Sequence, residues 1–147
     1  MLAIAGQYIP LAPGGGCSVA DVRDVAEGIL SAIEKAKVGE RYILGGHNTS
    51  YFQLWRMMAK IVGRAGPVGK LRPPITWIAG GAGDLFAKFA KEGQVNSAAV
   101  KMGQIYHYYD SGKATRELGY RLRPIEHGLN DAWDWFVQHG YAGKKNG

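Results

Sequence analysis

Hydrophobic residues recur three and four positions apart in several stretches of the chain, which is the spacing of amphipathic helices. The first helix is predicted from Asp24 to Val38, with an apolar face made of Val25, Ala26, Ile29, Leu30 and Ile33. Asp24 and Glu27 stand where a capping box would close the start of this helix. Because the other face is charged, we expect the apolar face to pack against the rest of the molecule.

A second helix is predicted from Tyr51 to Val62, with Thr49 or Ser50 as its N-cap and Gly63 beyond its end. Its polar stripe contains only Gln53, Arg56 and Lys60. A helix with so narrow a polar stripe has to be covered on more than one side. We therefore expect this helix to present an exposed apolar surface in the isolated chain, and we expect the chain to self-associate through it.

Three short strands are predicted, and the first two flank the first helix. They are the run that begins at Cys17, the segment RYILGG at residues 41–46, and IYHYY at residues 105–109. A strand, a helix and a strand in succession indicate a right-handed βαβ crossover. Three short strands are few for a covered sheet and leave open edges, so the chain has the pattern of a piece that packs against another segment.

The rest of the sequence is predicted to be mainly helical. After a short opening helix or coil, helices are expected over residues 75–91, 97–102 and 110–118, the last of these ended by Gly119. Pro124 begins the final helix, which Gly140 stops. The buried face of this helix is predicted to be Ile125, Leu129, Ala132, Trp133 and Phe136. The fold class is mixed α/β and rich in helix, with one region over residues 1–141 and a tail over 142–147.

The composition indicates the class of protein and its compartment, but it does not indicate a reaction or a ligand. Its 147 residues are 46% hydrophobic and 20% charged, which is typical of a globular domain. Cys17 is the only cysteine, the N-terminus has no signal-peptide pattern, and the apolar run over 75–89 is interrupted by Asp84 and Lys88. We expect a cytoplasmic protein that neither spans nor binds a membrane. The net charge is +6, but the basic residues are scattered, so no nucleic-acid partner is expected.

Three motifs occur in a characteristic order: SVADVRDVAEGILSAIE, then GERYILGGHNTSYFQLWRMMAKIVGRAGP, then YYDSGKATRELGYRLRP before a Trp-rich helix. From about Leu2 to Tyr141 the chain resembles the C-terminal part of the NAD(P)-dependent epimerase/dehydratase family, the extended short-chain dehydrogenase/reductases. It is most similar to the dihydroflavonol-4-reductase-like branch, which includes hopanoid-associated sugar epimerases. The Arg-x-Gly-Asp stretch of nucleotide-sugar epimerases is missing from KMGQIYHYYDSGKA, which makes a nucleotide-diphosphate sugar a less favoured substrate.

The resemblance implies a helix-rich C-terminal lobe without the N-terminal Rossmann half that binds the nucleotide. The parent enzyme would move hydride between NADP(H) or NAD(H) and a small-molecule carbonyl or alcohol. By position in the family, Tyr8, Leu11 and Ser18 would face the substrate, although simple packing explains each of them as well. The alternative is a non-catalytic module that binds a partner, or itself, through the apolar face from Phe52 to Val62.

The family's catalytic pair is Tyr-x-x-x-Lys on one helix, and Tyr109 and Lys113 have that spacing, with Ser97 upstream. The intervening Asp110-Ser111-Gly112 is a turn and helix-cap sequence, so we expect Tyr109 to end a strand and Lys113 to begin a helix. None of the glycine clusters, including Gly14–Gly16, has the spacing of a nucleotide-binding loop. We therefore predict no catalytic or cofactor-binding residue in this chain, no metal at its histidines, and no activity for the chain alone.

Overall fold

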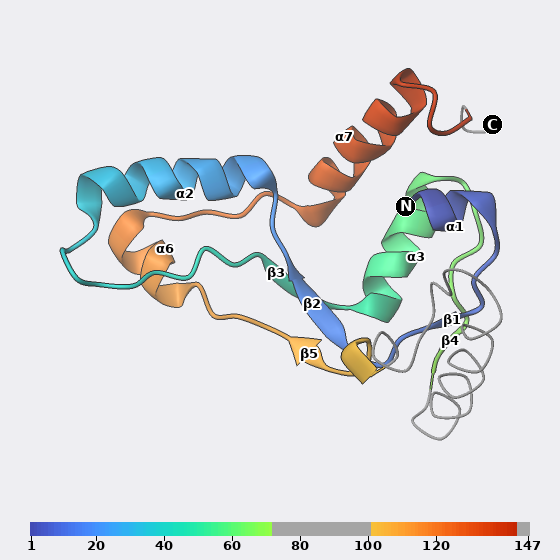
Figure 1. Ribbon diagram of the computed structural model, residues 1–147, viewed down its shortest axis with the longest axis horizontal. Helices are drawn as coiled ribbons and strands as arrows, with labels where there is room; N and C mark the ends of the chain where they lie inside the picture. The colour runs from blue at the N-terminus through green and yellow to red at the C-terminus, as the bar shows by residue number, and fades with distance from the viewer. Residues whose placement is uncertain (72–100, 144–147) are drawn as a thin grey trace, which may run out of the picture. The chain divides into compact units, whose positions relative to one another are not determined.

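The computed structural model describes residues 1–71 and 101–143, and the helix predicted over 75–91 lies outside them, as does most of that over 97–102 (Figure 1). The chain forms two compact units. The first unit consists of Met1–Gly16 and Ser50–Tyr106, and the second of Cys17–Thr49 and His107–Gly147. None of the described helices is both long and apolar enough to cross a membrane.

The first unit contains α1 (Leu2–Gly6), β1 (Leu11–Ala12), α3 (Tyr51–Ile61) and β4 (Gly69–Lys70). β1 pairs with β4 in parallel, with Leu11 opposite Gly69. Ser50 is the N-cap of α3, and its side chain forms a reciprocal capping box with Gln53, which confirms the predicted helix start. The large apolar residues of α3 are buried or half-buried, so the exposed face expected from Phe52 to Val62 is not observed.

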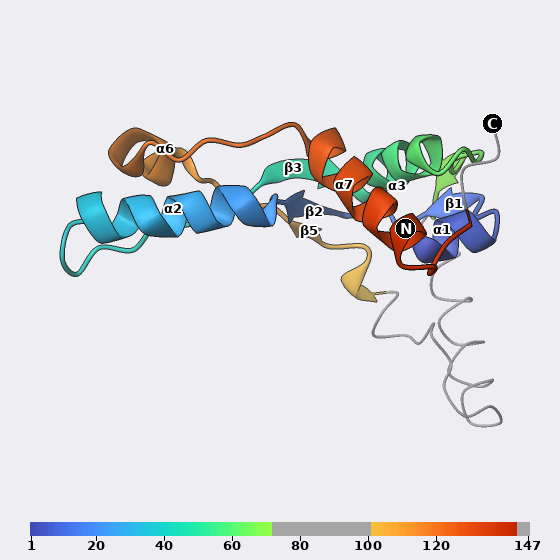
Figure 2. The ribbon, with the colours of Figure 1, turned by 90° about the horizontal axis from the view of Figure 1, so that it is seen from above.

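The second unit contains most of β2 (Gly16–Val19) and of β3 (His47–Ser50), the second residue of β5 (Tyr106–His107), and three helices. The helices are α2 (Val22–Lys35), α6 (Gly112–Leu118) and α7 (Ile125–Gln138). α6 lies alongside the C-terminal half of α2 (Figures 1 and 2). The core between them consists of Ala114, Leu118 and Tyr120, against which Ala32, Ala36, Tyr42, Leu44 and Leu122 pack.

The three strands of the second sheet are arranged in the order β3-β2-β5. The Tyr51 amide just after β3 donates to the Gly15 carbonyl just before β2, whereas the Gly46 amide before β3 donates to the Ser18 hydroxyl at 2.8 Å. β2 and β3 are therefore antiparallel, and Figure 1 draws their arrows in opposite directions. The predicted parallel βαβ crossover was wrong.

The prediction of a strand at residues 41–46 was also wrong, because the strand that follows α2 begins at His47. The amides of Gly45 and Gly46 are held by the hydroxyls of Ser111 and Ser18, at 2.9 and 2.8 Å, and not by the carbonyls of a neighbouring strand. A strand exists only where a second strand completes its ladder of hydrogen bonds. Residues 41–46 have a sequence suited to a strand but no such neighbour among the described residues.

The apolar face predicted to anchor α2 points outward instead. Ile29, Leu30 and Ile33 are 52%, 63% and 77% exposed, while the buried positions of α2 are Asp24 and Gly28. A Cβ built on Gly28 would lie 2.8 Å from the Tyr120 ring and 3.0 Å from the Leu44 side chain. The close approach of α2 to the core thus depends on small side chains on the side opposite the predicted one.

The two C-terminal helices were predicted more closely. α6 ends at Gly119, whose φ of 74° is the left-handed conformation that glycine adopts most readily at a helix end. Pro124, predicted as the first residue of the final helix, is the N-cap of α7, so the helix begins one residue later than predicted, and Gly140 follows its end with φ 75°. Trp133 is buried as predicted, whereas Ala132 is exposed.

The contact at Gly28 yields a test of this packing. Gly28→Ala should raise helix propensity by about 1 kcal/mol. It should nevertheless lower the free energy of unfolding by about 1–3 kcal/mol, because the methyl group overlaps the Tyr120 ring. Urea unfolding followed by circular dichroism measures the difference. Gly6→Ala in α1 is the matched control, since nothing lies within 4 Å of its added Cβ, and it should cost nothing. Stabilisation by Gly28→Ala would show that α2 does not pack here.

Candidate functional site

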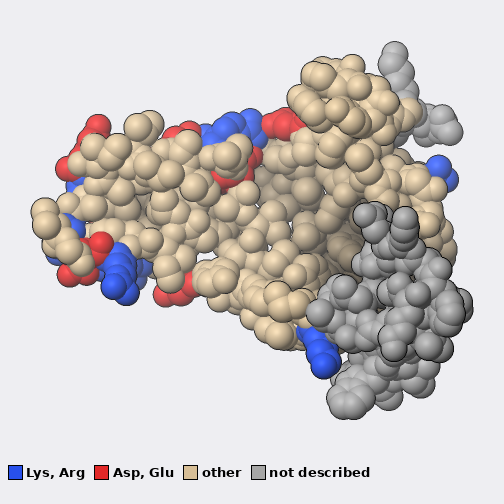
Figure 3. Space-filling model, viewed as in Figure 1, with Lys and Arg blue, Asp and Glu red and all other residues tan. Residues whose placement is uncertain are grey.

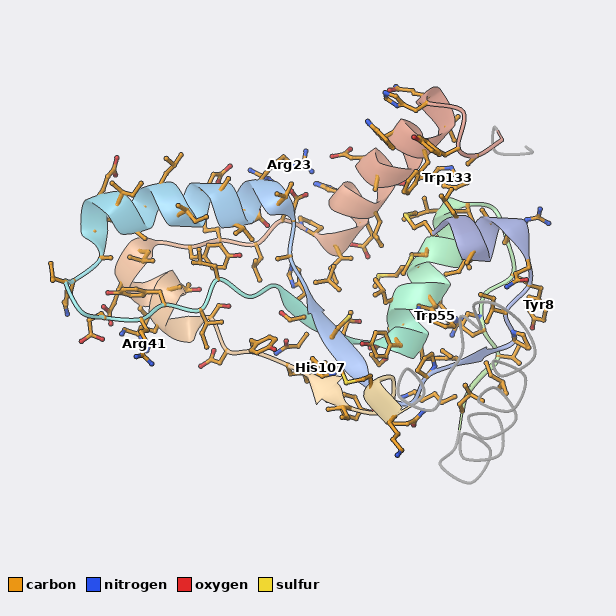
Figure 4. The ribbon with its side chains drawn as sticks, viewed as in Figure 1. Tyr8, Arg23, Arg41, Trp55, His107 and Trp133 are labelled. Carbon is orange, nitrogen blue, oxygen red and sulfur yellow. The ribbon has the colours of Figure 1, made fainter. Side chains whose placement is uncertain are left out.

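A cluster of charged side chains surrounds the start of α2, where Figure 4 labels Arg23. Asp21 is the N-cap of the helix, and its side chain accepts a hydrogen bond from the Arg23 amide at 2.9 Å. The predicted capping box of Asp24 and Glu27 was therefore wrong, because the N-cap is Asp21, three residues before Asp24. Asp24 lies inside the first turn and is free for another role.

Asp21 is bound by the side chain of Arg23 as well as by its amide. The guanidinium donates from Nε to Oδ1 at 2.8 Å and from Nη2 to Oδ2 at 2.5 Å. These hydrogen bonds hold the pKa of Asp21 well below its usual range, and the same pairing raises the pKa of Arg23. Arg23 Nη2 also lies 2.7 Å from Asp131 Oδ2 on α7, so one guanidinium joins the start of α2 to the middle of α7.

Asp24 is only 2% exposed and is compensated by Arg123. Its Oδ2 accepts from the Arg123 amide at 2.8 Å, and its Oδ1 lies 3.1 Å from Arg123 Nη1. Nη1 makes an ion pair there without the angle of a hydrogen bond, while Nη2 of the same guanidinium binds Glu27. A buried carboxylate is tolerated only with such partners. Asp24 thus fixes the segment before α7 to the first turn of α2.

A pocket of about 450 Å³ opens beside this cluster. Its apolar wall consists of Val19, Ala20, Val22, Pro124, Ile125, Leu129 and Ala132. Its charged members are Asp21, Arg23, Arg123 and Asp131, which are paired with one another or with Asp24 and Glu27. In Figure 3 acidic and basic atoms lie side by side over the start of α2. Because the guanidinium charges are already matched by carboxylates, the pocket fits an uncharged or apolar group better than an anion.

Tyr109 and Lys113 do not share a helix. Lys113 is in the first turn of α6, and its ammonium donates to Glu40 Oε2 at 2.5 Å and to the Arg41 carbonyl at 3.1 Å. The hydrogen bond with Glu40 raises the pKa of Lys113 and lowers that of Glu40. Tyr109 precedes α6, its side chain is 52% exposed, and its backbone exchanges two hydrogen bonds with the Asn48 amide group. Ser97 lies outside the described residues.

The three substrate-side candidates fall in different units and are described separately. Tyr8, labelled in Figure 4, lies between α1 and β1 and is 56% exposed, while Leu11 is half-buried in β1 of the first unit. Ser18 is on β2 in the second unit, and its hydroxyl accepts from the Gly46 amide. That contact gives Ser18 a structural role, and it leaves the hydroxyl proton for a further acceptor.

The histidines and the lone cysteine have ordinary surroundings. His47 Nε2 lies 2.8 Å from the Arg123 carbonyl, and His139 stacks on the ring of Trp135. Within residues 1–71 and 101–143, no three His, Cys, Asp or Glu side chains are grouped to hold a metal. Burial raises the pKa of the Cys17 thiol, which makes it a poor nucleophile.

Arg123 is the residue of this site that the sequence did not reveal. It belongs to the RLRP segment, but its partner Asp24 is 99 positions away in the chain. The only local signal is the Asp-x-Arg pattern of Asp21 and Arg23, which indicates a capped helix and not a long-range ion pair.

Comparisons with known proteins place the whole chain within a larger fold. No protein-family model matches it. A Synechocystis sp. protein named "Putative dihydroflavonol 4-reductase" is 34% identical over 144 residues, covering 92% of this chain and 41% of that protein. The structure of gox2253 has 35% sequence identity and a TM-score of 0.74, over 96% of this chain and 43% of its own.

Two epimerases share the fold. A nucleoside-diphosphate-sugar epimerase from Pseudomonas aeruginosa has 26% identity and a TM-score of 0.74, over 97% of this chain and 42% of its own. UDP-glucuronic acid 4-epimerase from Bacillus cereus, solved in complex with NAD, has 19% identity and a TM-score of 0.55, over 88% and 33%. The chain thus spans about two fifths of the length of the more similar relatives. The α/β fold class and the resemblance to the C-terminal part of the epimerase/dehydratase family are confirmed.

The same substitution should have effects of different size at the two aspartates of the cluster. Asp24→Asn should lower the free energy of unfolding by about 2–4 kcal/mol, because the Arg123 guanidinium loses its buried counter-charge. Asp21→Asn is the comparison variant and should cost less, about 1 kcal/mol, since asparagine is also a good N-cap and the half-exposed Arg23 keeps Asp131 as a partner. Urea denaturation of both variants measures the difference, and equal losses would contradict the roles assigned here.

Proposed function

We propose that this chain is the substrate-side lobe of an NAD(P)-dependent reductase or epimerase that oxidises or reduces a small carbonyl or alcohol compound. The observation that carries the proposal is the 34% identity to the Synechocystis relative over 92% of the chain. The two solved structures at TM-score 0.74 support it, because they match nearly all of this chain with less than half of their own length. In this proposal the nicotinamide is bound outside these 147 residues.

The local geometry supports assigning the catalytic pair elsewhere. A tyrosine acts as a general acid or base when a nearby ammonium lowers the pKa of its phenol. The ammonium of Lys113 is instead neutralised by Glu40 and bound to the Arg41 carbonyl. Tyr109 lies before the helix that carries Lys113, so the two side chains lack the one-turn spacing that the family motif requires.

The substrate side of the proposal rests on Tyr8, Leu11 and Ser18. Taken one by one, the exposed phenol of Tyr8, the half-buried side chain of Leu11 and the Ser18 hydroxyl, which keeps a proton to donate, are each a suitable contact for a small, partly polar carbonyl compound. NADP or NAD would be the hydride carrier of the complete enzyme. The competing function, a non-catalytic module that acts through the apolar face of α3, has less support because that face is largely covered.

The isolated chain should bind neither NADPH nor NADH. Binding would require backbone amides that cradle the pyrophosphate, and no glycine cluster in the sequence has the spacing for this. Calorimetric titration should show no saturable binding up to millimolar nucleotide. Saturable binding in the micromolar range would show that the cofactor site lies within the chain.

Tyr109→Phe provides the second test, in a chimera that joins the chain to the unmatched part of the Synechocystis relative. Turnover of a carbonyl substrate should stay within a few-fold of the unmutated chimera, whereas loss of a general acid typically costs about 10²–10⁴-fold. Lys113→Met is the companion variant, and its expected effect is a loss of stability without a specific loss of turnover. A collapse of turnover in Tyr109→Phe with unchanged thermal unfolding would make the pair catalytic.

A further inference from the structure

Three basic side chains of the first unit line a pocket that the proposed function does not use. The pocket has a volume of about 400 Å³, and the described residues that line it are Arg56, Met57, Lys60, Arg64 and Gly66. Arg56 and Lys60 lie four positions apart on α3, so they share one face of the helix, and Arg64 follows its end. We call these five residues the basic pocket.

The cations of the basic pocket are not matched by carboxylates. The described part of the first unit, residues 1–16, 50–71 and 101–106, contains five Lys and Arg residues and no Asp or Glu. Among the residues that the structure describes, the side chains of Arg56, Lys60 and Arg64 form neither an ion pair nor a hydrogen bond. In the second unit, by contrast, three cations each have a carboxylate partner. The basic pocket therefore has positive charge available for a ligand.

The chain after α3 folds back on the helix and thereby places Arg64. The Arg64 amide donates to the Ala59 carbonyl at 2.8 Å, and Gly63 before it has a φ of 71°, a conformation that glycine adopts readily. A Cβ built on Gly66 would lie 3.1 Å from Arg56 Cγ and 3.2 Å from Arg56 Cα. Because Gly66 has no side chain, the loop can lie directly against α3. The basic pocket is thus formed by a helix and a loop that is anchored to it through the backbone.

These groups suit a phosphoryl group better than a carboxylate. A phosphate monoester carries a charge of about −1.5 to −2 and three acceptor oxygens. A guanidinium binds two such oxygens as a fork, and an ammonium binds a further one as a point charge. A carboxylate has one charge and two oxygens, so it would leave part of the basic pocket unmatched. The half-buried Met57 offers an apolar contact to the organic part of an ester.

We propose that the basic pocket binds the phosphoryl group of a small, soluble phosphate ester. Arg56 and Arg64 hold its oxygens, Lys60 supplies the third positive charge, and Met57 contacts the organic part. The inference goes beyond the proposed function, because none of these residues is assigned there to the carbonyl substrate or to the nicotinamide. It stands or falls separately from the reductase activity.

The test is a titration of the whole chain with phenyl phosphate at constant ionic strength, followed by NMR chemical shifts. Binding should be saturable and of millimolar affinity, as is expected where the charges are exposed. Benzoate is the matched ligand, since it carries a carboxylate on the same ring. It should bind about tenfold more weakly, because it has fewer oxygens and less charge.

Two variants test the assigned residues. Lys60→Gln should weaken the binding of phenyl phosphate by about fivefold or more, because a charge-assisted hydrogen bond is lost. Lys101→Gln is the matched control, since it removes the same charge from an exposed lysine of the same unit that is not among the lining residues, and binding should stay unchanged. Arg64→Lys keeps the charge but loses the fork, so it should weaken binding by about threefold or more. Far-UV circular dichroism checks that the variants fold.

The outcomes decide between a phosphoryl site and its alternatives. Absence of saturable binding, or equal binding of benzoate, would overturn the proposal. Equal losses in Lys60→Gln and Lys101→Gln would indicate a general attraction of anions to a basic chain and would overturn it as well. Binding to vesicles that contain phosphatidic acid, without binding of phenyl phosphate, would assign the basic pocket to a lipid headgroup and overturn the soluble ligand. Weak binding of NADPH that phenyl phosphate displaces would place the 2′-phosphate of the nucleotide in the basic pocket, which supports the proposal and does not indicate a cofactor site.

Discussion

The pairing of Asp24 with Arg123 is the constraint on which the second unit depends. A carboxylate that is 2% exposed on the first turn of a helix has to be compensated, and both the amide and the guanidinium of Arg123 do so. This contact fixes the RLRP segment against the start of α2. Tyr120, three residues earlier, then fits against Gly28, and Pro124, one residue later, becomes a wall of the pocket. Gly28 and the buried Asp24 have the same effect, because each allows a neighbouring segment of the chain to lie close to α2.

That constraint also decides which face of α2 remains outside. The side that carries Asp24 and Gly28 is taken up by Arg123, Tyr120 and Leu44. The wide apolar face of the helix is consequently left without cover in the described part of the chain.

Local chemistry was predictable from the sequence, and long-range pairing was not. The N-cap of α3, predicted at Thr49 or Ser50, and the end of α6 at Gly119 depend on residues within one turn, and the structure confirms both positions. The predictions for the buried face of α2 and for a strand at residues 41–46 were wrong. An apolar pattern shows that a face or segment could be covered, but it does not show which part of the chain covers it. The prediction of Asp24 as the N-cap of α2 failed for a similar reason, because Asp21 is the N-cap. Both fit the local pattern, and only Arg123, 99 positions from Asp24, distinguishes them.

Tyr109 and Lys113 illustrate how the same spacing can serve a different purpose. On a single helix a lysine four positions after a tyrosine can hold its ammonium near the phenol. Here the helix begins between them, and the ammonium turns to Glu40 and the Arg41 carbonyl, 4.5 Å from the Tyr42 ring. Lys113 thereby anchors the first residue of the segment Arg41–Gly45 to α6, while Ser111 holds the Gly45 amide at its other end. A segment fixed at both ends by side chains keeps its central backbone extended and free of competing hydrogen bonds. The lysine of the apparent catalytic motif therefore has a structural role, because it holds Glu40 and Arg41 against the start of α6.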